Sequence, residues 1–439
     1  MTSTLRSSET PEVLAARMAD ARARTDEIFK IVSPDALYER AIPERHRLAF
    51  YLGHVEAFDG NLLRQAWDLA SFNPVYDKLF AFGIDPVDGA LPSEAAEVWP
   101  RPEPIRSYNG RIREAVDECL AGKRPLAAGH DAATILNMAI EHRLMHAETL
   151  AYLIHQLPYK VKHGKGDPPA PKAAAGDLTR KLRIPAGKAT LGRTRSSGVF
   201  GWDNEFQEKA VDVPAFDIDA HKVTNGQFEK FVEAGGYENK SYWTPEDWAW
   251  KEEQKLKHPF FWSKKGKGWK YHGMFADSDL SPNAPVYVSH AEAAAYARWT
   301  GRALPTEGQF HRAAYGTPTG EEREYPWGNE RPAEKHGNFD FHRWDPTPVG
   351  SYPAGASAFG VQELVGNGWE WTSSVFEPFP GFEAHPFYKG YSADFFDGKH
   401  YVMKGGSPRT AACMLRRSFR NWFQPRYPYV YASFRTVGV

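Results

Sequence analysis

Residues 142–148 read His-Arg-Leu-Met-His-Ala-Glu, inside a longer stretch, 129–157, that reads as an amphipathic helix. His142 and His146 are four residues apart, so on a helix their side chains lie one turn apart on the same face. Two imidazoles placed in this way can bind one metal ion. The stretch therefore predicts a helix that presents two metal ligands on one side.

A third histidine extends this prediction to a second helix. His54 lies in the segment Phe-Tyr-Leu-Gly-His-Val-Glu, residues 50–56, which is also helical in character. Three imidazoles from two helices that face a bundle core would form an open metal site, with positions left for oxygen or a substrate. The plainer interpretation is that all three are ordinary core or surface histidines. Glu148 also has two interpretations, as a group that orients a ligand or as a solvated helix charge.

The first part of the chain, about residues 10–160, predicts a helical bundle. Its amphipathic segments lie at 11–32, 44–69, 104–122 and 129–157. Four long helices favour an up-and-down bundle. The connection at about 70–103 is too long for a simple turn, and loops of that length are often functional.

The composition changes after the last predicted helix. Residues 160–177 are rich in Lys, Gly, Pro and Ala, which is typical of a semi-extended linker. Beyond it, short β-type runs at 216–219, 286–288 and 401–403 alternate with clusters of Gly, Pro, Asn and Trp. This pattern predicts a turn-rich α+β domain, and it contains no internal repeat.

The whole-chain composition narrows the class of protein. The 439 residues suffice for two or three domains, and a formal charge of −1 gives no reason to expect nucleic acid or an anionic membrane as partner. No apolar run is long enough to span a membrane, and the polar N-terminus does not read as a signal peptide. Two distant cysteines, Cys119 and Cys413, exclude a disulfide framework and fit a cytoplasmic location.

The second half resembles the formylglycine-generating-enzyme/sulfatase-modifying-factor fold, a variant of the C-type lectin fold. The matching pieces are Val223-Thr224-Asn225, Pro285-Val286, Leu304-Pro305-Thr306-Glu307, Tyr325-Pro326-Trp327-Gly328-Asn329, Glu363 to Thr372, Lys404-Gly405-Gly406-Ser407 and Ser433-Phe434-Arg435. The first half resembles a DinB-like four-helix bundle that carries a three-histidine metal site. We expect the bundle at 1–163, a linker at 164–178 and the lectin-like α+β domain at 179–439.

This combination of domains resembles the ergothioneine-pathway sulfoxide synthases and their selenoneine-forming relatives. The resemblance implies a non-haem iron(II) enzyme that uses O2 as co-substrate and holds the metal through His54, His142 and His146. It also implies the substrate hercynine, the trimethylated form of histidine, which receives sulfur or selenium on C2 of its imidazole ring.

The resemblance also suggests which residues bind the substrates. In these enzymes an Asn-Trp pair near the C-terminus lines the hercynine pocket, and Asn421 and Trp422 match it. A Trp face attracts a quaternary ammonium, although Trp422 also reads as core of a Trp-rich fold. Phe379 is expected at the same pocket. The carboxylate of the sulfur donor needs an arginine, for which the candidates are Arg101, Arg106, Arg416, Arg420 and Arg426.

The chain departs from its relatives at two places. Where some members carry a proton-donating tyrosine, this chain has Phe379 and Phe382, neither of which can donate a proton. Tyr108 and Tyr427 are the candidates to replace it, although Tyr429 and Tyr431 read as packing residues. Met145 also stands where relatives that use γ-glutamylcysteine carry Gln, which indicates altered handling of hercynine or of the donor.

Several alternatives stay open at this point. A thiol donor such as cysteine or γ-glutamylcysteine is favoured, and a selenosugar is the alternative. A zinc-dependent thiol transferase and a non-catalytic binding module are the rival classes, and metal identity separates them. A copper-dithiolate enzyme is disfavoured because Cys413 has no partner cysteine near it in the sequence. The oligomeric state is unknown from the sequence.

Overall fold

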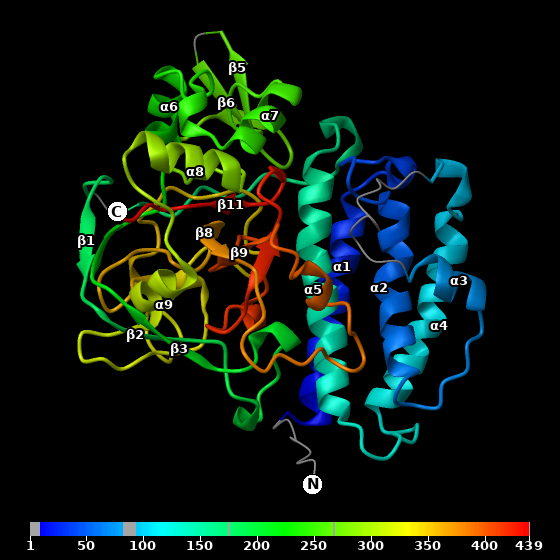
Figure 1. Ribbon diagram of the computed structural model, residues 1–439. Helices are drawn as coiled ribbons and strands as arrows, with labels where there is room; N and C mark the ends of the chain where they lie inside the picture. Colours follow the sequence, from blue (N-terminus) through cyan, green and yellow to red (C-terminus); the bar gives the residue numbers. More distant parts are fainter. Residues whose placement is uncertain (1–8, 82–93, 174–175, 267, 439) are drawn as a thin grey trace. The chain divides into compact units, whose positions relative to one another are not determined.

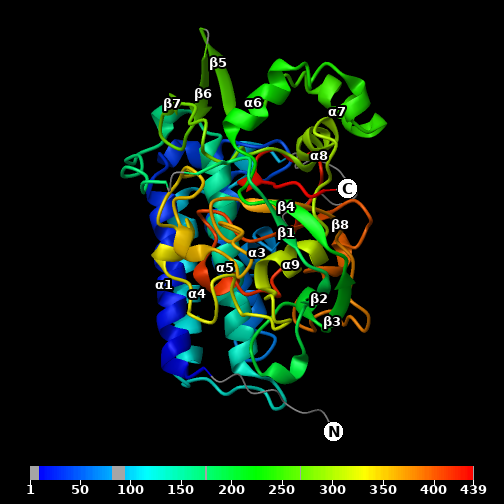
Figure 2. The same ribbon diagram turned by 90° about the vertical axis from the view of Figure 1, so that its left-hand side faces the viewer.

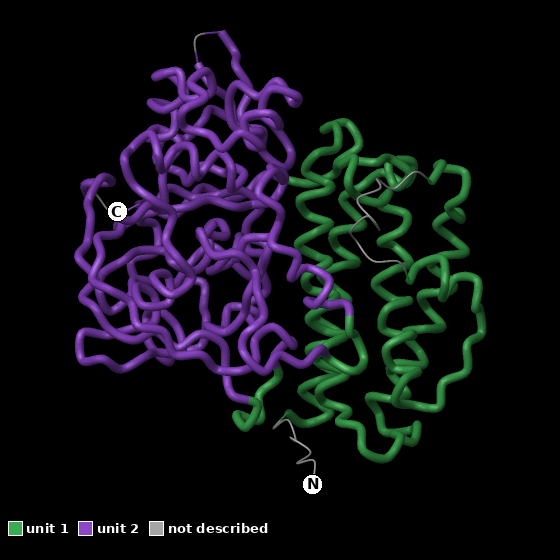
Figure 3. Tube along the Cα trace, viewed as in Figure 1, with its two compact units in different colours: residues 1–165, 195–200, 385–389 green, residues 166–194, 201–384, 390–439 purple. Residues whose placement is uncertain are grey.

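The computed structural model describes residues 9–81, 94–173, 176–266 and 268–438. They form two compact units, which are described separately (Figure 3). Unit 1 contains residues 1–165, together with two short later segments, 195–200 and 385–389; unit 2 contains the remaining residues of the chain. Among the described residues, no helix combines the length and the hydropathy that crossing a membrane requires.

Unit 1 is a four-helix bundle, as the sequence predicted (Figure 1). Its long helices are α1 (Pro11–Lys30), α2 (Leu48–Leu63), α4 (Pro102–Leu120) and α5 (Ala132–His155). Helix α1 packs on α4 and α5, and α2 also packs on α4 and α5, so each helix has two neighbours. Helix α5 begins after Asp131, whose side chain accepts hydrogen bonds from the backbone N–H groups of Ala133 and Thr134.

The connection between α2 and α4 contains a short helix that the sequence analysis did not predict. Helix α3 (Pro74–Leu79) begins after Asn73, whose side chain caps it by accepting from the backbone N–H of Tyr76. Pro74 occupies the first helical position, where its missing N–H costs nothing. A 3-10 turn (Ala96–Val98) follows just before α4, and the rest of this connection, 82–93, lies outside the described residues.

Unit 2 combines small sheets with short helices. The largest sheet has four strands in the order β10-β9-β8-β11, in which β11 runs parallel to β8 and the other pairs are antiparallel. Its strands are β8 (Trp369–Val375), β9 (Tyr401–Lys404), β10 (Asn421–Phe423) and β11 (Ala432–Ser433).

Three smaller antiparallel sheets complete the strand structure described in unit 2. They pair β1 (Lys181–Ile184) with β4 (Phe216–Asp219), pair β2 (Gly187–Leu191) with β3 (Lys209–Val213), and join β5 (Trp262–Lys265), β6 (Gly268–His272) and β7 (Asp277–Asp279) in that order. The helices are α6 (Asn225–Glu233), α7 (Pro245–Glu253), α8 (His290–Trp299) and α9 (Glu307–Tyr315).

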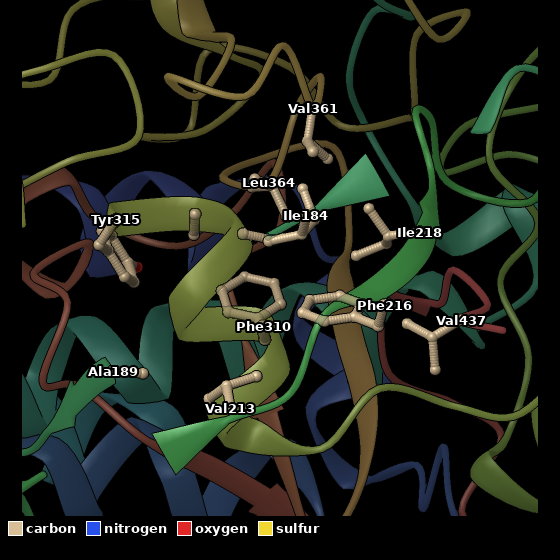
Figure 4. Close-up of a cluster of buried hydrophobic side chains, with 12 residues drawn as sticks. Ile184, Ala189, Val213, Phe216, Ile218, Phe310, Tyr315, Val361, Leu364 and Val437 are labelled. Carbon is tan, nitrogen blue, oxygen red and sulfur yellow. The ribbon is translucent and has the colours of Figure 1, made fainter. Parts of the chain in front are cut away.

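A cluster of buried apolar side chains holds α9 against the surrounding strands. Helix α9 packs on β2 and β3 and also on β8 and β9 (Figure 2). Phe310 of α9 and Phe216 of β4 are both fully or almost fully buried in this cluster (Figure 4). The other members are Ile184, Ala189, Val213, Ile218, Ala313, Ala314, Tyr315, Val361, Leu364 and Val437. Burial of this apolar surface is the main favourable contribution to folding here.

The strand predictions are partly confirmed. The run at 216–219 is β4, and the run at 401–403 lies within β9. The strand predicted at 286–288 is wrong, because these residues are extended but lie outside the named ladders. The N–H of Val286 donates to the carbonyl of Val223, and the N–H of Val288 donates to that of Ala432. The continuous apolar run of Val286, Tyr287 and Val288 thus indicated burial and not membership of a sheet.

Candidate metal centre

The three histidines singled out in the sequence meet inside unit 1. His142 and His146 lie on α5 and His54 lies on α2. One ring nitrogen from each lies within 4.8 Å of the other two, and the Nε2 atoms of His142 and His146 are 3.1 Å apart. All three side chains are buried. The packing of α2 on α5 therefore produces the convergent imidazoles that the sequence spacing predicted.

Burial keeps these imidazoles in the neutral form that binds metal ions. It lowers the pKa of His54 to about 4, against the smaller opposing effect of the Phe80 carbonyl. Burial, followed by the charges of the neighbouring histidines, also lowers the pKa of His142 well below its ordinary value. The pKa of His146 is lowered by burial in the same way. At neutral pH the cluster thus offers lone pairs rather than positive charge.

The hydrogen bonding of the cluster also fits a metal ion. The Nδ1 of His54 lies 2.6 Å from the carbonyl oxygen of Phe80, so Nδ1 carries the proton and Nε2 holds the lone pair. The Nδ1 atoms of His142 and His146 are buried and have no hydrogen-bond partner among the described residues. Three neutral imidazoles suit Fe²⁺ and Zn²⁺ alike, and they leave coordination positions open.

Aromatic side chains surround the histidines. The ring of Phe58 stacks on His142, with 3.4 Å between centroids and 12° between planes. Phe50 stacks on His54 at 4.7 Å. Phe50 and Phe58 each lie four residues from His54 on α2, so a helical-wheel argument from His54 could have found both. These rings give the cluster an apolar lining.

One aromatic neighbour comes from far along the chain. Tyr388 belongs to the segment 385–389, which packs with unit 1, and its ring is edge-on to Phe58 at 5.2 Å and to His142 at 6.2 Å. The neighbouring Phe387 is anchored on the bundle, because its carbonyl accepts from Gln65 at 3.1 Å and its ring contacts His130. No local sequence pattern indicates this contact, so sequence reasoning missed Tyr388.

An ion network, fully buried at Arg143, Glu56 and Asp59, ties the four helices together beside the histidines. Arg143, which follows His142, donates to both carboxylate oxygens of Glu56, at 2.9 and 2.6 Å, and also to Asp59. Arg113 of α4 donates to Glu56 at 2.7 Å and pairs with Asp26 of α1. The guanidinium groups hold the pKa of the Glu56 carboxyl below its usual value, against the effect of burial. The network links every helix of the bundle.

Four of the residues predicted to bind substrate lie in unit 2. The guanidinium of Arg420 lies 4.3 Å from the ring centroid of Phe379 and donates to Glu307 at 3.1 Å. Both Arg420 and Phe379 line a cavity of about 500 Å³ at the start of α9. Trp422 stacks on Phe376 at 4.2 Å, and its backbone N–H donates to the side chain of Asn421.

The two tyrosines predicted as proton donors have other neighbours. The hydroxyl of Tyr108 donates to Asp77 at 2.6 Å, and burial, together with that carboxylate, raises the pKa of Tyr108. Tyr427 lies in unit 2, where its ring stacks on Phe423 at 5.3 Å.

The other candidates from the sequence are dispersed. Arg416 pairs with Glu205 and Arg426 pairs with Asp247, whereas Arg101 and Arg106 are exposed near the start of α4. Met145 and Glu148 are half-buried on α5. Neither Cys119, in unit 1, nor Cys413, in unit 2, forms a disulfide bond.

Comparison with known proteins accounts for both parts of the chain. The DinB superfamily matches residues 17–150, and the sulfatase-modifying factor enzyme 1-like domain matches residues 167–438. Hercynine oxygenase of Mycolicibacterium thermoresistibile is 34% identical over 436 residues, covering 90% of this chain and 95% of that protein. Hercynine oxygenase of Mycobacterium tuberculosis is 32% identical over 437 residues, covering 97% and 98%.

A fungal relative matches most of this chain within a longer protein. Ergothioneine biosynthesis protein 1 of Neurospora crassa is 28% identical over 507 residues, which cover 93% of this chain and 55% of that protein. The bundle, the second domain and the near full-length similarity agree with one another. The chain belongs to the hercynine oxygenase family of enzymes, in which a DinB bundle precedes a sulfatase-modifying-factor-like domain.

Proposed function

We propose that this enzyme forms a carbon–sulfur bond between C2 of the hercynine imidazole and a thiol such as cysteine or γ-glutamylcysteine, with iron(II) and O2. Membership of the hercynine oxygenase family supports hercynine as the substrate and the ergothioneine pathway as its setting. The observation that carries the proposal is the convergence of His54, His142 and His146 at a buried site.

The proposed reaction balances as an oxidation by one molecule of O2. The C2–H bond of hercynine and the S–H bond of the thiol break, and a C–S bond forms, which releases two electrons. Oxidation of the sulfur to a sulfoxide releases two more. O2 takes up the four electrons, leaving one oxygen atom on sulfur and the other in water.

Iron(II) suits this reaction better than zinc, although the three imidazoles would hold either ion. Zinc has no redox chemistry, whereas bound iron(II) supplies the electron transfer that O2 needs in order to react. We therefore assign His54, His142 and His146 as the iron ligands. Their apolar surroundings, Phe50 and Phe58 among them, exclude water from the reacting groups.

A proton must reach the reduced oxygen, and we propose Tyr388 as its donor. Its ring is edge-on to His142, whereas the hydroxyl of Tyr108 is engaged by Asp77. Tyr427 lies in unit 2 and packs on Phe423. We assign the proton-donating role to Tyr388, and the variants Tyr108→Phe and Tyr427→Phe test the two earlier candidates.

We propose contacts to hercynine and to the donor for the four residues singled out in the sequence. Trp422 is half-buried, and its indole face suits the trimethylammonium group of hercynine through a cation–π interaction. The Asn421 amide can hydrogen-bond the carboxylate of hercynine. Arg420 and Phe379 line a cavity of about 500 Å³, which would take the thiol donor with its carboxylate on the guanidinium.

The test is a turnover assay with alternative donors. Protein loaded anaerobically with iron is mixed with hercynine and with cysteine, γ-glutamylcysteine or a selenosugar, and O2 is then admitted. Mass spectrometry should detect a C2-sulfur adduct of hercynine that requires both iron and O2 and that is absent with His142→Ala.

The other outcomes decide between the alternatives. A product formed only from the selenosugar would show that the enzyme forms a carbon–selenium bond instead of a carbon–sulfur bond. Met145 and Phe379, where the chain departs from its relatives, are the reason to test this donor. No product with any donor, together with stoichiometric zinc, would favour the thiol transferase. No product and no bound metal would favour a non-catalytic binding module.

A further inference from the structure

One of the three histidines of the proposed metal site is held by a hydrogen bond to the backbone just after α3. Phe80 follows α3 directly, and its carbonyl oxygen lies 2.6 Å from Nδ1 of His54. His142 and His146 have no equivalent partner among the described residues. The orientation of His54 therefore depends on where the end of α3 lies.

A glycine on α2 makes room for that end. If Gly53 carried a Cβ atom, it would lie 2.6 Å from each of three atoms of the Phe80 ring. Such a distance is far below van der Waals contact, so the ring can approach α2 this closely only because residue 53 has no side chain. Gly53 is also the residue directly before His54 on the helix. The contact of Gly53 with Phe80 and the hydrogen bond of His54 to Phe80 therefore involve neighbouring residues of α2.

The rest of α3 is fixed to the bundle by its buried aspartate. Asp77 accepts a hydrogen bond from Tyr108 at 2.6 Å and forms an ion pair with Arg64 at 2.9 Å, and its backbone carbonyl accepts from Asn61. The Phe80 ring is fully buried and packs on Trp99. These contacts come from α2, from α4 and from the turn before α4. They leave the Phe80 carbonyl little freedom to move away from His54.

We propose that Gly53 and Phe80 are positioning residues that set the tautomer and the ring orientation of His54. With its proton held on Nδ1 by the Phe80 carbonyl, His54 directs the lone pair of Nε2 toward the other two imidazoles. The opposite tautomer would direct an N–H into the cluster and block ligation. This inference rests on the three-histidine metal site of the proposed function, but it does not depend on the reaction.

The chain offers a matched control for Gly53. Gly60 lies on the same helix, and an added Cβ there would come within 2.8 Å of the terminal methyl of Ile112. Both Gly→Ala changes improve helix propensity equally and both crowd a buried neighbour. Only Gly53→Ala displaces the residue that bonds His54.

The first measurement is the tautomer itself, read from imidazole nitrogen NMR shifts of metal-free protein. Wild type and Gly60→Ala should show the His54 proton on Nδ1, and Gly53→Ala should show a mixture of tautomers. A proton on Nε2 in the wild-type protein would overturn the proposal, even if Gly53→Ala failed to fold. Because this readout needs neither metal nor substrate, it stands apart from any failure of the proposed reaction.

The second measurement is Co²⁺ affinity, followed by the visible ligand-field bands. Gly53→Ala should weaken binding by about 10- to 100-fold, as expected when a metal-ligating histidine loses its partner. Gly60→Ala should change the Co²⁺ affinity by no more than about threefold. The double variant Gly53→Ala/Phe80→Leu, which restores room while keeping the carbonyl, should recover most of the loss. Wild-type affinity and bands in Gly53→Ala would contradict the proposal.

Discussion

The guanidinium of Arg143 donates to both carboxylate oxygens of Glu56, and neither side chain is exposed to solvent. Arg143 directly follows His142 on α5, and Glu56 lies two residues after His54 on α2. This pair therefore fixes the alignment of the two helices at the level where their histidines meet. Taking both charges out of water costs desolvation free energy that their attraction must offset, so such a pair is weak evidence of net stability.

Removing one partner of this pair should destabilise the bundle strongly. Arg143→Met leaves the buried carboxylates of Glu56 and Asp59 poorly compensated, so the free energy of unfolding should fall by about 3–5 kcal/mol. Denaturant unfolding of the metal-free protein measures this change. The control is Arg124→Met, which breaks an ion pair with Glu118 in which both side chains are 43% exposed. That change should cost at most about 1 kcal/mol. Equal effects of the two variants would contradict the role of Arg143.

The metal-free protein should lose stability on acidification. The folded-state pKa of His54 is lowered to about 4 from the ordinary 6.5, so the unfolded chain binds the proton more readily between these values. Stability contributed by neutral His54 is therefore complete above pH 6.5 and falls by about 3 kcal/mol toward pH 4.

The buried Asp59 carboxyl changes the free energy of unfolding with pH in the opposite sense, so the test compares wild type with a His54 variant. Burial raises the pKa of Asp59 to about 6 from 3.8, which makes the protein less stable as pH rises through that range. Subtracting the unfolding free energies of His54→Gln from those of wild type across this pH range cancels the Asp59 term. The difference should decline with acid, and a flat difference would show that His54 is not protonated on unfolding.

Tyr388→Phe should slow the step that consumes O2 without changing metal binding. A proton donor held in place typically contributes about 10²-fold or more in rate. Single-turnover kinetics with hercynine and the active donor measure this change, with Co²⁺ affinity as the check on the metal site. Tyr427→Phe is the matched control, because the Tyr427 ring packs on Phe423 in unit 2, and it should leave the rate within about threefold of wild type. A large loss with Tyr108→Phe alone would transfer the role to that residue.

Trp422→Leu should raise the KM for hercynine and change kcat less. A desolvated cation–π contact is worth up to about 2 kcal/mol, which corresponds to roughly a 30-fold change in affinity. Trp422→Phe keeps an aromatic face and should produce a smaller increase. Steady-state kinetics measure both variants. If the two substitutions gave the same small change in KM, Trp422 would be a packing residue that stacks on Phe376 and does not contact hercynine.

The bundle and the class of the second domain could be predicted from the sequence, because amphipathic periodicity and motif spacing are local properties. The short helix α3 was missed although Asn73 and Pro74 carry its start signals, because one and a half turns of helix give no periodicity. The strand predicted at 286–288 was wrong because a buried segment that makes isolated backbone hydrogen bonds, to Val223 and to Ala432 of β11, has the same apolar pattern as a strand.

The candidate metal site could likewise be predicted only in part from the sequence. His142 and His146 could be identified from their spacing, and His54 from its place on a second predicted helix. The partner of His54 could not be predicted, because a backbone carbonyl leaves no residue-type signature, and Phe80 supplies one. Tyr388 could not be predicted either, since only the three-dimensional packing brings segment 385–389 against Phe58.

The most direct test of the account is an anaerobic Fe²⁺ titration of wild type and of His54→Ala, His142→Ala and His146→Ala, with metal content measured after desalting. We predict one tightly bound iron per wild-type chain and loss of that iron in each of the three variants. The far-ultraviolet circular dichroism of every variant should still show the helical bundle. Full iron binding in all three folded variants would contradict the claim that these histidines form one metal centre.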